Sequence, residues 1–284
     1  MGQDDRVKTF SRGPLTFDVV DAGPPDGQPV ILLHGFPETS ASWADVVPGL
    51  HRHGFRTLAP DQRGYSRAAR PKGRRSYSIG ELVADVVALA DAAGAERFHL
   101  VGHDWGGIVA WHFASAHPER LVTVTSLSTP HPGAFQDSLI RSTQLLKSYY
   151  MFAFQLPGLP ERSLLASDGK AFRRALRKSG LHDEAITRYM ETLREPGAMT
   201  AALNYYRALP VSGRQALRCG DIAVPTLYVW STEDTALSRR AAELTARHVT
   251  GPYRFEILEG VSHWIPEEEP AEVTRLLLEH FGRS

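Results

Sequence analysis

The sequence predicts an α/β fold, a mostly parallel sheet with helices on both faces, into which one helical cap is inserted. Strand-like and helical segments alternate through Pro132 and again after Gly220, whereas the stretch between them holds amphipathic helical runs broken by LPGLPE. A chain of 284 residues is long enough for about two such units. We therefore expect a core made of residues 1–132 and 221–284, with the cap over residues 133–220.

The first element that bears on function is the segment PVILLHGFPETSASW. An unbroken apolar run over residues 30–33 predicts a buried strand, and the turn His34-Gly35-Phe36-Pro37 follows it directly. A loop in this place can supply a backbone N–H group to an oxyanion hole, and we expect the Phe36 amide to be that donor. The tight turn makes Pro37 a candidate for a cis peptide bond. Taken alone, the same residues would be typical of an ordinary turn.

The central motif is VGHDWGG at residues 101–107, where Asp104 lies between a strand-like and a helical segment. Gly102 and Gly106 stand two residues before and after Asp104. This is the pattern of a nucleophile elbow, a strained turn that is too crowded for a Cβ at either glycine. An aspartate can also be an ordinary helix N-cap, but here the other parts of a catalytic site follow in the expected order. The Trp105 amide would be the second oxyanion-hole donor.

Two loops further along the chain carry the other members of a catalytic triad. PTLYVWSTEDTALS predicts a buried strand over residues 226–230 and a loop with Glu233 and Asp234. YRFEILEGVSHWIPEEEP predicts another strand and a loop with His263 before the final helix. The chain order of nucleophile, acid and histidine, each at the carboxyl end of a strand, predicts that an acid orients His263. Spacing favours Asp234 over Glu233 for that role.

The aspartate at the elbow changes the chemistry that the site can perform. A carboxylate is ionised at neutral pH without the help of a base, and it displaces leaving groups from sp³ carbon better than it attacks esters. The substrate should therefore be an alkylating molecule, such as an epoxide or an alkyl halide. His263 would be needed only afterwards, to activate water against the ester on Asp104.

Five segments together resemble one known family: HGFPE at 34–38, DQRGYS at 61–66, GHDWGG at 102–107, STPHPGAF at 128–135 and SHW at 262–264. They are similar to those of the α/β-hydrolases with an aspartate nucleophile, and in particular to the soluble epoxide hydrolases. The resemblance covers nearly the whole chain. It implies an α/β-hydrolase core with a cap, and the conversion of an epoxide to a 1,2-diol through a covalent alkyl-aspartyl ester. It also adds His34, Pro37 and Trp264 to the expected oxyanion-hole and substrate-binding residues.

The same resemblance implies that two cap tyrosines protonate the opening epoxide oxygen. YMFAFQLPG is similar to the first tyrosine context, which selects Tyr150, and LNYYRA is similar to the second, which selects Tyr206. Each has a tyrosine neighbour, so Tyr149 and Tyr205 remain alternatives.

Two other functions are compatible with the fold. A dehalogenase would use the same aspartate, histidine and ester, but it must also bind the departing halide. Halide binding in haloalkane dehalogenases resembles a two-donor clamp, made of an indole after the nucleophile and a Trp or Asn side chain after the HG pair. Trp105 fits the first position, whereas Phe36 offers no side-chain donor at the second. Together with the tyrosine contexts, this difference favours epoxide hydrolysis. A non-catalytic member that binds a small apolar molecule is the third possibility, although the sequence keeps every catalytic group.

Composition limits the partners. The 32 basic and 32 acidic residues cancel, so no charged footprint for nucleic acid or an anionic membrane is expected. The sequence contains no Cys and His residues at the spacing of a metal site, no P-loop and no glycine motif for a dinucleotide. We therefore expect no cofactor and no metal. The N-terminal residues contain no apolar targeting segment and Cys219 is a lone cysteine, so a cytoplasmic location is the default. The expected partners are a small-molecule epoxide and water; the oligomeric state is left open.

Overall fold

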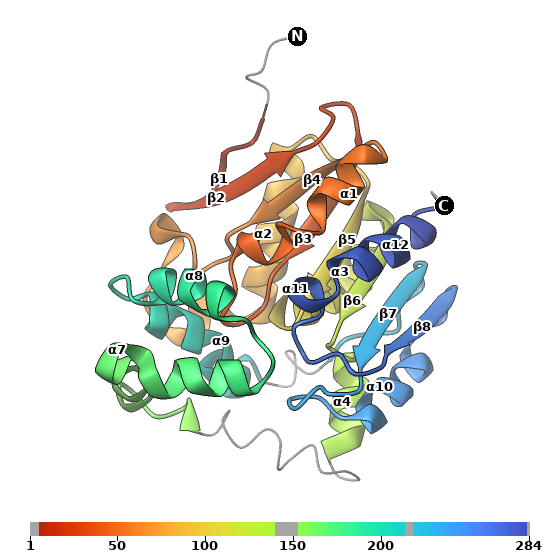
Figure 1. Cartoon of the computed structure of the whole chain (residues 1–284). Helices are drawn as coiled ribbons and strands as arrows, with labels where there is room; N and C mark the ends of the chain where they lie inside the picture. Colours follow the sequence, from red (N-terminus) through yellow and green to blue (C-terminus); the bar gives the residue numbers. More distant parts are fainter. Residues whose placement is uncertain (1–5, 140–152, 214–217, 283–284) are drawn as a thin grey trace.

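The computed structural model describes residues 6–139, 153–213 and 218–282, and they form the mostly parallel sheet that the sequence predicts (Figure 1). The strand order is β1-β2-β4-β3-β5-β6-β7-β8. The pairs β1–β2 and β2–β4 are antiparallel, and every other neighbouring pair is parallel. The strands are β1 (Thr9–Arg12), β2 (Leu15–Ala22), β3 (Gln28–Leu33), β4 (Phe55–Pro60), β5 (Phe98–His103), β6 (Leu121–Leu127), β7 (Thr226–Ser231) and β8 (Tyr253–Leu258).

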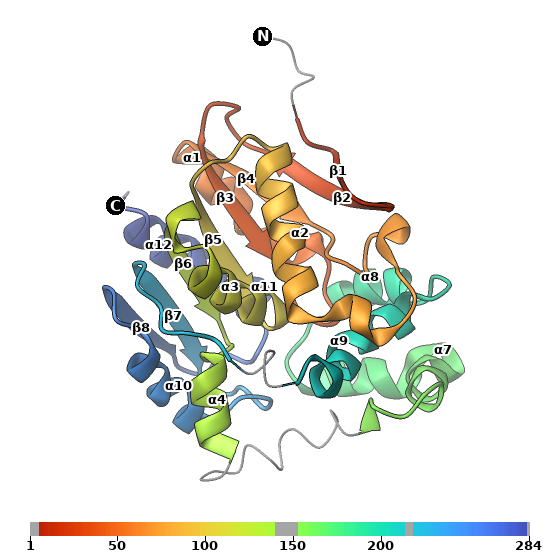
Figure 2. The same ribbon diagram turned by 180° about the vertical axis from the view of Figure 1, so that it is seen from behind.

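Helices cover both faces of this sheet. Helices α1 (Val47–Arg52) and α12 (Pro270–His280) contact each other on the face that is turned toward the viewer in Figure 1. Helices α2 (Ile79–Ala92) and α3 (Trp105–Ala116) contact each other on the opposite face, which Figure 2 shows. The short helix α11 (Ile265–Glu268) precedes α12. Within the described residues, no helix is both long and apolar enough to cross a bilayer.

The pattern of burial explains why the strands are so apolar. Successive side chains of a strand point to opposite faces, so a strand covered on both faces must be apolar at every position. In β3, Val30 and Leu32 belong to the core cluster shared with α1 and α12, whereas Ile31 and Leu33 belong to the cluster shared with α2 and α3. All four side chains are fully buried, which fixes the end of β3 where the HGFP turn begins.

The described part of residues 133–220, the predicted cap, is mainly helical. It contains α7 (Leu159–Lys178), α8 (Asp183–Leu193) and α9 (Ala198–Ser212), which lie together beyond the carboxyl ends of the parallel strands (Figure 1). Non-helical backbone at residues 166–169 divides α7, and Gly169 at φ +71° packs so closely that a Cβ there would lie 2.5 Å from the Met190 methyl group.

The chain enters the insertion through α4 (Pro132–Leu139), which contacts α10 (Arg239–Leu244) of the core. The predicted domain boundary at residues 132 and 133 thus falls at the start of a helix that packs on the core. The division into core and cap remains a prediction.

Candidate active site

Asp104 occupies a strained turn between β5 and α3, with φ 48° and ψ −115°. Positive φ is unfavourable for a residue with a Cβ, and such strain is typical of functional sites. The flanking glycines permit the turn. A Cβ on Gly102 would lie 2.1 Å from the Gly106 carbonyl oxygen, and a Cβ on Gly106 would lie 2.1 Å from the Leu33 carbonyl oxygen. The turn therefore brings Asp104 against the end of β3, as a nucleophile elbow does.

The HGFP loop forms one wall around the Asp104 carboxyl group. The Phe36 backbone N–H donates a hydrogen bond to Asp104 Oδ1 over 2.8 Å, and the Phe36–Pro37 peptide bond is cis. Gly35 is needed here because its Cβ would lie 2.4 Å from the Asp104 Cβ. Trp105 is the first residue of α3, so its amide has no acceptor within the helix. One of the two expected oxyanion-hole donors is thus in hydrogen-bond contact with Asp104.

His34 supports this loop from inside the protein. Its ring is fully buried; Nδ1 is 2.9 Å from the Gly35 carbonyl oxygen, and Nε2 accepts the Gln62 backbone N–H at 3.1 Å. Because a carbonyl oxygen only accepts, Nδ1 carries the proton and the ring is neutral. Burial lowers the pKa of His34, in agreement with the neutral form. Both nitrogens are committed to backbone groups, so His34 holds the loop and has no free polar group for a substrate.

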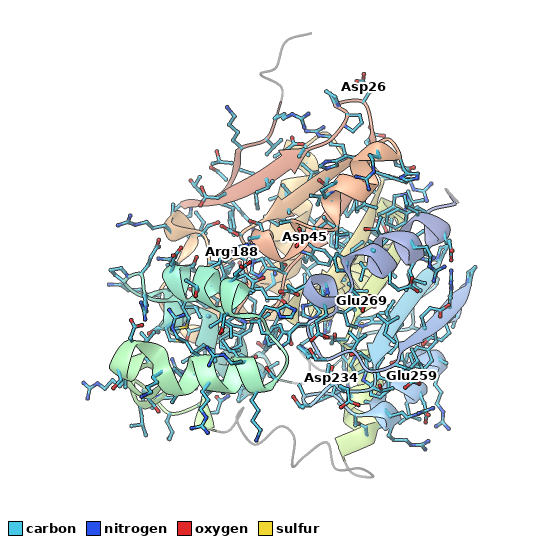
Figure 3. The ribbon with its side chains drawn as sticks, in the orientation of Figure 1. Asp26, Asp45, Arg188, Asp234, Glu259 and Glu269 are labelled. Carbon is cyan, nitrogen blue, oxygen red and sulfur yellow. The ribbon has the colours of Figure 1, made fainter. Side chains whose placement is uncertain are left out.

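His263 and Asp234 complete a triad with Asp104. His263 Nδ1 lies 2.7 Å from Asp234 Oδ2, and His263 Nε2 lies 3.5 Å from Asp104 Oδ2. Asp234 follows β7 (Figure 3), and its Oδ1 also accepts the backbone N–H groups of Ala236 and Leu237 at 2.7 and 2.8 Å. Glu233 is exposed, whereas Asp234 is buried. The geometry therefore brings Asp234 to His263, as spacing had favoured.

Charge is concentrated in the triad. Burial alone would raise the pKa of Asp104, but the His263 ring and the Phe36 N–H group bring this pKa below its ordinary value. Burial alone would lower the pKa of His263, but the carboxylates of Asp234 and Asp104 raise it well above its ordinary value. Each partner stabilises the charged form of the other. The Asp104 side chain is still 20% exposed, so a ligand can reach this ionised carboxylate.

Aromatic rings from α9 and from the segment before α7 pack on Trp105 and Phe36, the residues beside Asp104. Tyr206, on α9, meets the Trp105 and Phe36 rings edge to face, with centroid distances of 5.1 and 5.4 Å. Phe154 lies 5.1 Å from the Tyr206 ring. Tyr205 points elsewhere, because its hydroxyl donates to the Arg63 carbonyl oxygen at 2.7 Å. Of the two adjacent tyrosines, Tyr206 is therefore the one whose ring lies on Trp105 and Phe36 while its neighbour's hydroxyl is committed to the backbone.

Two further expected residues fall in different parts of the chain. Tyr150, with its neighbour Tyr149, lies outside the described residues. Trp264 packs edge to face on His263, and its Nε1 donates to Ser179 Oγ at 3.1 Å, just after α7. Trp264 thus joins the histidine loop to the turn that follows α7.

A buried polar pair, Glu38 and His103, lies behind the site and was not predicted from the sequence. Glu38 Oε2 accepts the Gly35 N–H at 2.6 Å, and His103 Nδ1 lies 2.8 and 2.9 Å from the two Glu38 carboxyl oxygens. His103 Nε2 lies 2.8 Å from the His263 carbonyl oxygen. The signal was present, because Glu38 ends the HGFPE segment and His103 is a polar residue at the end of an apolar strand. Within the part of the chain that the structure describes, no cluster of three His, Cys, Asp or Glu side chains could hold a metal ion.

Comparison with known proteins gives a matching family and several related chains. The chain matches the alpha/beta hydrolase fold family over residues 28–270. It is 40% identical over 274 residues to the AB hydrolase superfamily protein YfhM of Bacillus subtilis, with 94% of each chain covered. It is 34% identical over 300 residues to epoxide hydrolase A of Mycobacterium tuberculosis, with 92% of each chain covered. A mutant epoxide hydrolase from Bacillus megaterium, solved with its naphthyloxy-propane-1,2-diol product, is 25% identical with a TM-score of 0.86, over 97% of this chain and 100% of that one.

Proposed function

We propose that this chain, which belongs to the alpha/beta hydrolase fold family, is an epoxide hydrolase that forms a covalent ester on Asp104. The observation that carries the proposal is the Asp104 carboxylate itself, held at an elbow between the Phe36 N–H group and the His263–Asp234 pair. The related epoxide hydrolases support the choice of substrate class.

In the first step, Asp104 Oδ2 attacks one epoxide carbon from the side opposite the ring oxygen. Oδ1 is held by the Phe36 N–H group, which leaves Oδ2 as the attacking atom. The carbon–oxygen bond of the ring breaks as the ester bond forms. Tyr206 and Tyr150 donate a hydrogen bond and then a proton to the departing ring oxygen. The product of this step is an alkyl ester of Asp104 with a neighbouring hydroxyl group.

In the second step, His263 removes a proton from water, and the water oxygen attacks the carbonyl carbon of Asp104. The amides of Phe36 and Trp105 stabilise the oxyanion, and Asp234 stabilises the imidazolium that forms. Collapse of the tetrahedral intermediate breaks the bond from the acyl carbon to the alkyl oxygen. The departing alkoxide takes the proton from the His263 imidazolium, and the 1,2-diol leaves. The Asp104 carboxyl group then loses its remaining proton, which restores the tyrosine that was deprotonated in the first step, and Asp104 regains its charge.

The electrostatics suit this division of labour. The Asp104 carboxylate is one of the groups that raise the pKa of His263. Ester formation removes that negative charge, so the pKa of His263 falls when the ring has to act as a base. The first step needs an ionised Asp104 and no base, and the second needs a neutral His263. The loss of the Asp104 charge on ester formation therefore ends the first step and prepares His263 for the second.

Product analysis tests the proposal. The purified protein is incubated with aryl, alkyl and fatty-acid epoxides, with haloalkanes and with fluoroacetate, and both diol and halide are measured. We expect diol from at least one epoxide and no released halide, in keeping with the absence of a side-chain donor on Phe36. Halide release without diol would establish a dehalogenase, and neither product would favour a non-catalytic binding protein.

A further inference from the structure

A second carboxylic acid lies behind the site and takes no part in the chemistry above. Glu267, on α11, lies beside Glu38, and Tyr189 of α8 donates its hydroxyl to Glu267 Oε1 at 2.7 Å. The Glu267 Oε2 atom is buried and has no N–H donor among the described residues. Glu38 and Tyr189 are both fully buried. Two carboxyl groups thus meet inside the protein, between the HGFP loop and the cap.

A hydrogen bond between two carboxyl groups requires a proton on one of them, because a carboxylate only accepts. The second Glu38 partner is His103, whose two ring nitrogens face a Glu38 oxygen and the His263 carbonyl oxygen. Two carboxylates at the same buried place would repel each other, so this arrangement favours one proton held between the two acids.

Other titratable and charged groups face this pair, and none of them supplies a second nearby positive charge to Glu267 itself. From the core these groups are His34, Tyr65, His103 and Asp104, and from α8 they are Arg188 and Tyr189. Arg188 acts on Tyr189, and its guanidinium group donates to the Ala41 carbonyl oxygen at 3.4 Å. Burial, together with the charge of Glu38, raises the pKa of Glu267 well above its ordinary value, whereas the pKa of Glu38 is lowered by His103 against the effect of burial. Glu38 also accepts the Gly35 N–H and contacts His103, whereas the hydrogen bond recorded for the Glu267 side chain comes from Tyr189, so we assign the shared proton to Glu267.

We propose that Glu38 and Glu267 form a proton-sharing carboxyl pair through which Glu267 acts as a positioning residue for the oxyanion-hole loop. The inference about rate rests on the function proposed above. Glu38 Oε2 holds the Gly35 N–H, and the next amide in the chain, that of Phe36, binds Asp104 Oδ1. The Glu267–Tyr189 hydrogen bond ties the same unit to α8 of the cap. Loss of the shared proton places two carboxylates against each other and displaces the loop.

The consequence is a loss of rate at alkaline pH in the second chemical step. A misplacement of about 1 Å in a catalytic group can cost about a hundredfold in rate, so we expect ester hydrolysis to slow by roughly tenfold or more once Glu267 ionises. Buried glutamates have been found to titrate up to about pH 8–9. The tyrosines that protonate the epoxide oxygen do not act in this step, so their ionisation does not contribute to the loss.

The first test compares single-turnover ester hydrolysis from about pH 6 to about pH 10 in wild type, Glu267→Gln and Glu269→Gln. The glutamine keeps an acceptor for Tyr189 and a donor for Glu38 but has no proton to lose. Glu269 is exposed at the end of α11 (Figure 3) and serves as the matched control. We expect the alkaline loss in wild type and Glu269→Gln, and a flat alkaline limb in Glu267→Gln. The same alkaline loss in all three proteins would overturn the proposal.

The second test observes the proton directly and does not depend on turnover. In protein labelled with carbon-13 at glutamate carboxyl groups, difference infrared spectra should show a protonated carboxyl group at neutral pH in wild type but not in Glu267→Gln. If wild type has no such group, the shared proton does not exist and the inference is wrong. A protein that yields no diol yet shows the protonated carboxyl group would contradict the proposed function alone. Diol formation without the protonated carboxyl group would contradict only the positioning role.

Discussion

Replacing Asp104 by asparagine tests the electrostatic link between the two steps. The change removes the charge and keeps the shape of the side chain. His263 Nε2 lies 3.5 Å from Asp104 Oδ2, and two unit charges at that distance attract by about 5 kcal/mol at an effective dielectric constant of about 20. At about 1.4 kcal/mol for each factor of ten, this attraction corresponds to roughly a thousandfold in proton binding by His263. Because Asp104 is 20% exposed, solvent screens part of it, and we expect at least about a tenfold weakening.

The assay is a nuclear magnetic resonance titration of the histidine ring nitrogens, in which the His263 signals are assigned by their loss in His263→Gln. Asp26→Asn is the control, since Asp26 is exposed in the turn between β2 and β3 (Figure 3). Intact mass verifies that the new amide has not hydrolysed. We expect the pKa of His263 to fall in Asp104→Asn and to stay unchanged in the control. Identical titration of His263 in wild type and Asp104→Asn would refute the idea that ester formation releases the base.

Three further outcomes follow from particular contacts. Tyr206→Phe should slow ester formation by roughly ten- to a thousandfold in stopped-flow assays. Tyr205→Phe leaves the buried Arg63 carbonyl without its hydrogen-bond donor, so it should lower the free energy of unfolding by about 1–3 kcal/mol and leave the rate of ester formation near wild type. The reverse pattern would exchange the roles of the two tyrosines. Gly106→Ala puts a Cβ against the last carbonyl of β3, and it should destabilise the protein by roughly 1–3 kcal/mol or more in urea titrations. Gly80→Ala, which has open space around it, is the control and should not destabilise the protein. Equal stability of the two variants would contradict the claim that the turn at Asp104 is too crowded for a Cβ. Folding raises the pKa of Glu267, so its contribution to stability is fully present below about pH 4 and is lost as pH rises through the folded-state pKa. Glu267→Gln should therefore reduce the slope of the free energy of unfolding against pH by up to about 1.4 kcal/mol per pH unit. An unchanged slope would mean that Glu267 is already ionised.

The sequence was sufficient wherever one segment carries its own signal. The apolar runs of β3, β5 and β7 follow from burial on both faces, and the elbow follows from Gly102 and Gly106, which stand close together in the chain. The fold class and the strands that present the site could therefore be predicted. The family resemblance added Tyr206, whose ring the structure brings to Trp105.

What could not be predicted depends on contacts between distant segments. Sequence spacing favoured Asp234 over Glu233 as the partner of His263 without separating them firmly. In the structure the Asp234 carboxyl group faces His263, whereas Glu233 is exposed. Glu38 and Glu267 come from opposite ends of the chain, and although Glu38 ends the HGFPE segment, neither segment shows that the two side chains meet. The proton-sharing pair proposed above depends on their contact, which exists only in the folded chain.

The most direct measurement of the central claim is the intact mass of His263→Gln after mixing with an epoxide that the wild type hydrolyses. If Asp104 is the nucleophile, this variant gains the mass of one substrate molecule, and Asp104→Ala gains nothing. In water enriched in heavy oxygen, a single wild-type turnover should leave the label in the Asp104 carboxyl group, because water attacks the ester carbonyl carbon. An unmodified His263→Gln protein, together with label in the diol from the first turnover, would show that water opens the epoxide directly and that no ester forms on Asp104.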